Sequence, residues 1–409
     1  MGGLGWIDFS PEHRNRVSSV IDLLKPEGRI DELGIGIVRN ALSDILFPGT
    51  STIQTRAKYF ILIPRMFKEY QIKFENKKTK PKLKEYLRQR ENQIIRILAE
   101  KYDGTDVQGI IGIRLAGTHK SRELARKPST IYWVGLRLFG IIRTSLSFTE
   151  YIEKHDRRES FIDLLEVSDD EKGDDRDAGY DDAFSISLPD VSRAWDEDLK
   201  IELTYEEADF LKNKIIDTQG DKFIGQILKD RKLMDIFVKV KNFSNMCDVF
   251  LEKSIPQATK TILKLAKDFD QIIHGAHIRY NCVLQKRFGT EAKRDEFLTK
   301  WQDWWEKTKA DNALIRGFDV ESLIELSTTL RPFTRAFIRN WVDSLRKSES
   351  VEYFDRLVTD QELANKGGKA RLRKGASEKA NDWIGIDGLS YRFPVVRNIV
   401  NDIKYGLSY

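Results

Sequence analysis

A chain of 409 residues is long enough to form two or three domains, each with its own hydrophobic core. A hydrophobic content of 40% with a charged content of 33% is typical of a globular protein, and no apolar run is long enough to cross a bilayer. Two cysteines, Cys247 and Cys282, are too few for a disulfide framework and indicate a reducing compartment. Because the N-terminus lacks the basic start and apolar core of a signal peptide, we expect a cytoplasmic protein.

The net charge of +5 is unevenly distributed along the chain. Residues Asp169–Asp182 are strongly acidic, so the remainder is more basic than the total suggests. Basic clusters occur beside aromatic residues or glycines at Lys73–Arg90, Arg114–Lys127 and Lys366–Lys374. Such clusters usually form solvated faces, but three in one chain favour a polyanionic partner.

The first 165 residues combine helical patterns with turns marked by glycine and proline. The spacing of apolar residues predicts helices over 11–24, 37–46, 53–70 and 82–101. Ser10 is a suitable cap for the first of these. Pro64 is expected to end or kink the third.

The stretch between the second and third predicted helices is the most informative part of the sequence. Asp44 precedes a Phe47-Pro48-Gly49 turn, and three hydroxyl side chains follow before Gln54 and Arg56. A hydroxyl-rich turn that leads into a helix offers N–H groups and a positive dipole end to a phosphate. We therefore predict that Asp44 and Gln54 are catalytic residues. The predicted DNA contacts of this stretch are Thr50, Ser51, Thr52 and Arg56. A capped helix after a turn is the alternative.

Residues 126–142 predict either a DNA-reading helix or a helix of the core. Pro128 and Ser129 suit the start of a helix, and Gly140 suits its end. Basic residues ahead of a helix that opens with Ser-Thr resemble the reading helix of a winged helix. On that interpretation the DNA contacts are Arg126, Lys127 and Ser129.

An acidic stretch poor in hydrophobic residues, 168–192, is the best candidate for a linker. We expect an N-terminal domain over 1–165, an acidic linker or loop over 166–200, and a helical C-terminal domain over 201–409. The last should begin with a capping box of Thr204 and Glu207. Further helices are predicted over 256–288, 298–307 and 332–345. The predicted fold class is mainly α, with some α+β character and winged-helix-like elements in the N-terminal domain.

The basic cluster near the C-terminus is predicted to contact a DNA backbone. Its glycines permit close approach, and Lys366, Lys369, Arg371 and Arg373 supply positive charge for phosphates. Tyr391 and Arg392 follow, and their planar groups suit a splayed-out base. A flexible surface loop is the alternative.

No motif in the sequence indicates a metal or a cofactor. His274, His277 and Cys282 lack the spacing of a zinc site, and residues 365–372 do not match a P-loop. Cleavage of an N-glycosidic bond requires neither, because an ionised aspartate can stabilise the charge that builds on the sugar and can orient water. The target base must first flip into a pocket. Asp44 is the residue predicted for this role, and Asp8 better suits a helix cap.

Five segments together resemble a bacterial family of formerly unknown function that is often encoded among phage-defence genes. They are GWIDFS (5–10), LSDILFPGTSTIQTRA (42–57), KPSTIYW (127–133), KGGKARL (366–372) and LSYRF (389–393). The resemblance implies the activity of a phage-defence DNA glycosylase in that family, which removes glucosylated hydroxymethylcytosine and leaves abasic sites. It assigns no catalytic residue.

Two other classes of function remain open. A non-catalytic winged-helix sensor of a phage-defence locus would depend on Arg126 and Lys127 rather than on Asp44. A metal-dependent nuclease is a third possibility, against which the lack of a clustered acidic motif argues. The expected partner in each case is double-stranded or locally melted DNA, with no membrane and no obligate protein partner.

Overall fold

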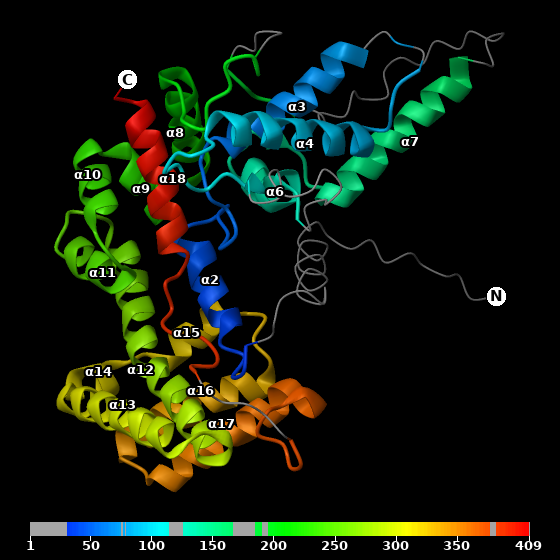
Figure 1. The fold of residues 1–409 in the computed structure, drawn as a ribbon. Helices are drawn as coiled ribbons and strands as arrows, with labels where there is room; N and C mark the ends of the chain where they lie inside the picture. The colour runs from blue at the N-terminus through cyan, green and yellow to red at the C-terminus, as the bar shows by residue number, and fades with distance from the viewer. Residues whose placement is uncertain are drawn as a thin grey trace, which may run out of the picture. The chain divides into compact units, whose positions relative to one another are not determined.

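The computed structural model describes residues 31–74, 77, 79–113, 126–166, 185–189, 195–376 and 382–408. These residues form a mainly helical protein, as predicted (Figure 1). The strands described are β1 (Ile142–Arg143) and β2 (Ser185–Ile186), which pair antiparallel. Within this part of the chain, no helix has the length and apolar composition needed to cross a bilayer. Asp8, the helix predicted over 11–24 and most of the predicted acidic linker lie outside the described residues.

The chain divides into two compact units that are interleaved along the sequence. Among the described residues, unit 1 contains those of 31–39 and 268–389, and unit 2 contains those of 40–267 and 390–408. The boundaries fall inside two helices, α2 (Gly36–Leu46) and α12 (Gln257–Phe288). The division predicted from the acidic stretch is different. Local composition does not reveal contacts between segments that are far apart in the sequence.

Nine of the described helices lie wholly within unit 2. They are α3 (Tyr59–Phe74), α4 (Leu83–Lys101), α6 (Pro128–Leu138), α7 (Phe148–Glu166), α8 (Tyr205–Gln219), α9 (Phe223–Lys229), α10 (Arg231–Lys239), α11 (Phe243–Leu251) and α18 (Phe393–Gly406). The predicted capping box at the start of α8 is confirmed. The Glu207 N–H donates to Thr204 Oγ1 at 3.3 Å, and the Thr204 N–H donates to Glu207 Oε2 at 3.0 Å. Pro64 lies inside α3 and does not end it, because the buried residues around it offset the cost of about 3 kcal/mol for an internal proline.

Helix α6 packs one face into the core of unit 2. It begins at Pro128 as predicted, but it buries Tyr132, Trp133 and Leu136. Ser129 is 1% exposed, and its N–H donates to the buried Glu91 Oε1 at 2.7 Å. Strand β1 follows α6, but its partner β2 comes after α7, so the two strands do not form a hairpin wing. The described residues of this region therefore do not form the predicted winged helix.

Unit 1 is built around α12 and an aromatic cluster. Its other helices are α13 (Glu291–Ala310), α14 (Asn312–Gly317), α15 (Val320–Leu326), α16 (Pro332–Lys347), α17 (Val351–Lys366) and the 3₁₀ turn η2 (Gly367–Lys369). The indole N–H of Trp341 donates to the Ile272 carbonyl of α12 at 3.0 Å, and the ring of Trp341 lies 5.1 Å from that of Phe354. The helix predicted over 298–307 adds Trp301 and Trp304 to this cluster, and each of their rings lies 6.4 Å from that of Trp341.

Replacing Gly275 by alanine is expected to lower the free energy of unfolding by about 1–3 kcal/mol. A Cβ atom at this position of α12 would lie 2.2 Å from the rigid, buried indole of Trp304. The clash outweighs the roughly 1 kcal/mol that alanine contributes to helix propensity. Urea unfolding measures the change. Gly317→Ala is the matched control, because nothing lies within 4 Å of its added Cβ, and an equal change in both variants would contradict this explanation.

Candidate functional site

The Phe47–Gln54 turn in unit 2 is held by its own side chains. The Gln54 Nε2 donates to the Gly49 carbonyl, and its Oε1 accepts the Ser51 N–H, both at 3.2 Å. The Thr50 hydroxyl donates to the Phe47 carbonyl at 2.7 Å. Gln54 is 3% exposed, so its amide serves as an internal clamp and cannot orient a water for catalysis.

The same turn brings together three of the residues predicted for the site. Arg392 Nη1 donates to Asp44 Oδ1 at 2.6 Å and to the Thr50 carbonyl at 2.7 Å. The Arg392 side chain is 12% exposed, whereas that of Asp44 is 63% exposed. Asp44 is thus a solvent-facing carboxylate that a largely buried guanidinium holds in place. Thr52 is also exposed, and Ser51 is half-buried.

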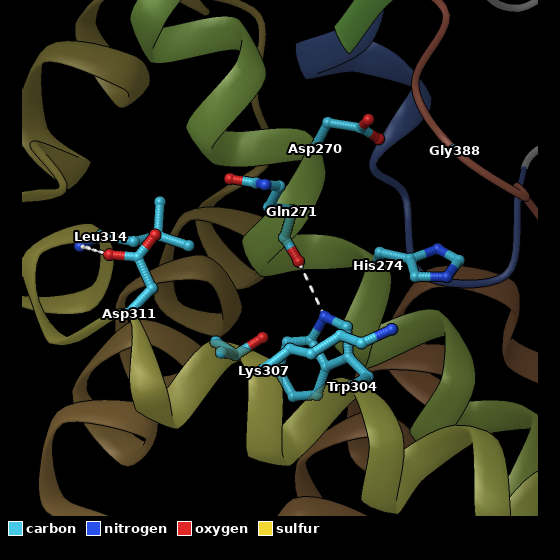
Figure 2. A pocket seen from close by; sticks show the side chains of 9 residues that line it. Asp270, Gln271, His274, Trp304, Lys307, Asp311, Leu314 and Gly388 are labelled. Atoms are coloured by element: carbon cyan, nitrogen blue, oxygen red, sulfur yellow. Dashed lines mark hydrogen bonds between the residues drawn. The ribbon is translucent and has the colours of Figure 1, made fainter. Parts of the chain in front are cut away.

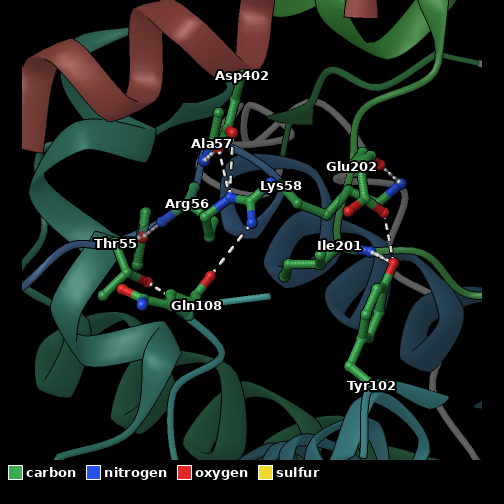
Figure 3. A network of polar contacts seen from close by, with 11 residues as sticks. Thr55, Arg56, Ala57, Lys58, Tyr102, Gln108, Ile201, Glu202 and Asp402 are labelled. Carbon is green, nitrogen blue, oxygen red and sulfur yellow. Dashed lines mark hydrogen bonds and ion pairs between the residues drawn. The ribbon is translucent and has the colours of Figure 1, made fainter. Parts of the chain in front are cut away.

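Arg56, predicted as a DNA contact, is instead an anchor inside unit 2 (Figure 3). Its Nε lies 3.0 and 2.9 Å from the two carboxylate oxygens of Asp402, and its Nη1 donates to the Gln108 carbonyl at 3.2 Å. The Ala57 N–H donates to the same carboxylate at 2.8 Å. Burial raises the pKa of Asp402 even though the pairing with Arg56 opposes the rise.

The remaining predicted contacts of unit 2 differ in accessibility. Tyr391 is fully buried and its hydroxyl donates to the Ala266 carbonyl at 2.8 Å, so its ring cannot stack on a base. Ser129 is buried as described above. Arg126 is exposed and Lys127 is half-buried at the start of α6. The rest of the basic cluster over 114–127 lies outside the described residues.

The basic segment, residues 366–374, belongs to unit 1. Lys366 Nζ is paired with Glu32 Oε1 at 2.6 Å, and the two side chains are 16% and 11% exposed. Its charge is therefore neutralised within unit 1. Lys369 is exposed, and Arg371 is half-buried with its N–H donated to Glu362 Oε1 at 2.9 Å.

A pocket of about 330 Å³ lies in unit 1 between α12, α13 and the start of α14 (Figure 2). Its volume falls in the range of roughly 300–1,000 Å³ typical of small-molecule sites. Its polar lining includes Asp270, Gln271 and His274 of α12, together with Lys307 and Asp311. The Trp304 N–H donates to the Gln271 carbonyl at 3.0 Å and fixes the floor of the pocket.

The titratable groups of this pocket are strongly influenced by burial. Burial raises the pKa of Asp270 to about 6, the Leu389 N–H at 2.5 Å opposes the rise, and Asp387 adds to it. Burial also lowers the pKa of His274, whose ring stacks on Trp383 with centroids 5.6 Å apart. At neutral pH the pocket thus contains a carboxyl that is a stronger base than an ordinary aspartate, beside a neutral imidazole.

Asp270 and His274 are part of a polar stripe on one face of α12. With His277 and Asn281 they recur at intervals of four, three and four residues, which places them on one side of a helix. The segment 382–389 is bonded to this stripe at both ends. The Asn281 Nδ2 donates to the Ile384 carbonyl at 2.8 Å, and its Oδ1 accepts the Ile384 N–H at 2.9 Å. At the other end, the Leu389 N–H donates to Asp270 Oδ1.

Asp270 was not among the predicted site residues. The signal that could have identified it is this polar spacing within an otherwise apolar helix. His277, which follows on the same face of α12, is 1% exposed, and burial lowers its pKa to about 3.

In the described part of the chain, no group of three or more His, Cys, Asp or Glu side chains could hold a metal ion. Comparison with curated proteins and with solved structures found no match. The model of a family of unknown function, DUF6361, matches residues 1–402, and the chain therefore belongs to this uncharacterised family.

Proposed function

We propose that this protein is a DNA glycosylase that hydrolyses the N-glycosidic bond of a hypermodified base, in the class of glucosylated hydroxymethylcytosine, and leaves an abasic site. The observation that supports the proposal most directly is the pocket of unit 1, where the carboxyl of Asp270 stands beside a neutral His274. The resemblance of the sequence motifs to the phage-defence glycosylase supplies the substrate class.

Asp270 is the proposed general base. As the bond between C1′ and the base nitrogen breaks, its electrons leave with the base, and a water oxygen bonds to C1′ while Asp270 takes a proton from that water. The ionised carboxylate also stabilises the positive charge that develops on the sugar. The neutral His274 can donate one hydrogen bond to the departing base, which then takes a proton from solvent.

The basic segment suits the same substrate because it lies in the same unit. Glu362, which binds the segment, accepts the Tyr280 hydroxyl of α12 at 2.9 Å. Asp270 and Tyr280 are separated by ten residues of one helix, or about 15 Å at 1.5 Å per residue. A DNA strand can span this distance within a few nucleotides. The pocket would then receive the flipped nucleotide while the segment holds the flanking backbone.

Asp44 remains the rival carboxylate. It is exposed and paired with Arg392 beside a hydroxyl-rich turn, so it could stabilise a cationic sugar in unit 2. Its ion pair with the Arg392 guanidinium, however, reduces the negative charge that Asp44 can offer to a transition state. The rates of variants that lack one or the other carboxylate decide between Asp44 and Asp270.

Incubation of the purified full-length chain with DNA that contains glucosylated hydroxymethylcytosine, in the presence of a chelator, is expected to produce alkali-labile sites. Unmodified DNA of the same sequence is the control. Intact modified DNA after alkali would refute the proposal. Strand breaks that appear before alkali and disappear with the chelator would identify a metal-dependent nuclease, and tight binding without cleavage would favour the sensor alternative.

A further inference from the structure

The backbone of the basic segment is fixed by a buried carboxylate. Glu362 is 0% exposed, and its Oε1 accepts the Tyr280 hydroxyl and the Arg371 N–H, while its Oε2 accepts the Leu372 N–H, each at 2.9 Å. The side chains of Ala370 and Leu372 are buried, and Arg287 donates to the Leu372 carbonyl. The basic segment is therefore a turn that is anchored in unit 1, and not the flexible surface loop that was the alternative.

What this turn presents to solvent is cationic and free of bulky apolar groups. Lys369, Arg373 and Lys374 are exposed, and no ion pair with them occurs among the described residues. Lys366, by contrast, forms an ion pair with Glu32. The apolar side chains of the segment point into the core, so the surface has nothing to insert into a bilayer. Its chemistry fits a polymer of phosphates better than a lipid surface.

The glycines of the turn leave its backbone open to a ligand. Gly367 has a φ of +52°, which favours glycine, but Gly368 has no positive φ, and no atom of the described residues lies within 4 Å of a Cβ placed there. Among the described residues, neither packing nor backbone conformation requires a glycine at 368. Close approach of an external group to the backbone N–H groups is a remaining physical reason for it.

We propose that the turn of Gly367, Gly368 and Lys369, together with Arg373 and Lys374, binds the phosphodiester backbone of a nucleic acid. This inference deepens the proposed function and rests on it for the identity of the polymer. It keeps the contact at Arg373, which the sequence also suggested, adds Lys374, and removes the contact from Lys366.

The test is the salt dependence of binding to unmodified duplex DNA, which involves no cleavage. Each phosphate neutralised contributes about 0.9 to the slope of log K against log salt, so the variant K369A/R373A/K374A should lose up to about 2.7 from that slope. The control variant K309A/R316A/K347A removes the same residue types from exposed positions of unit 1. Its slope should match the wild type, and equal slopes in both variants would overturn the proposal.

A second pair of variants tests the approach to the backbone. Gly368→Ala should weaken binding by about tenfold, the loss expected for one hydrogen bond to a charged group, without lowering the unfolding midpoint. Gly317→Ala, equally open, should neither weaken binding nor lower the midpoint. If the Gly368→Ala variant binds DNA as tightly as the wild type, the backbone contact is excluded. If the triple variant has a reduced slope but the wild type forms no abasic sites in modified DNA, the glycosylase proposal alone is refuted. If the wild type forms abasic sites but the slope of the triple variant is unchanged, this inference alone is refuted.

Discussion

Asp270→Asn is expected to lower the rate of abasic-site formation by about 10²–10⁴-fold, the usual contribution of a general base. Asparagine keeps the shape of the side chain and can still accept the Leu389 N–H, but it cannot take a proton from water. Single-turnover assays on modified DNA measure the rate, and DNA binding should remain within a few-fold of the wild type because the phosphate contacts are unchanged.

The matched controls are Asp311→Asn, at the opposite wall of the pocket, and Asp44→Asn in unit 2. Both should retain most of the rate. If Asp44→Asn abolishes the reaction while Asp270→Asn does not, Asp44 is the catalytic carboxylate, and the assignment to the pocket is wrong.

The pH dependence gives an independent signature of the same residue. Burial raises the pKa of Asp270 to about 6, so the carboxyl is ionised and active as a base above that pH and is protonated below it. The rate should therefore rise as the pH increases through about 6. The groups around Asp270 that could modify this are His274 on α12, Asp387 and the Leu389 N–H on segment 382–389, and Lys307 and Asp311 across the pocket. A profile that is flat between pH 5 and 7, a window of about one unit on each side of that pKa, would contradict the role of Asp270.

Arg56→Ala is expected to lower the free energy of unfolding by about 3–5 kcal/mol, because it leaves the Asp402 carboxylate without its partner. The side chains of Arg56 and Asp402 are 18% and 8% exposed, and the pair joins the segment after the Phe47–Gln54 turn to α18. Urea unfolding at neutral pH measures the loss.

Arg339→Ala is the control for Arg56, because its ion pair with Glu321 is 46% and 61% exposed. Removal of such a solvent-screened pair should leave the free energy of unfolding nearly unchanged. Weakened DNA binding by Arg56→Ala with unchanged stability would restore the DNA-contact role that the sequence suggested for Arg56.

The chemistry of a residue type does not reveal how it is used. Arg56 and Tyr391 are residue types that contact DNA, and Gln54 is a residue type that can assist catalysis, so the sequence predicted these roles for them. In the structure the partner of Arg56 is 346 positions away along the chain, and Tyr391 is bonded to a carbonyl 125 positions away. No local pattern contains this information, because long-range partners are determined by packing.

Local signals by themselves determined the mainly helical class, the Thr204–Glu207 capping box and the start of α6 at Pro128, since each depends on neighbours within one turn of the backbone. Only the tertiary structure decided that α6 belongs to the core, that Lys366 is neutralised by Glu32, and that Asp270 lines a pocket with side chains from α13. The physical reason is burial. Whether a charged group is paired, desolvated or free depends on segments that meet only when the chain has folded.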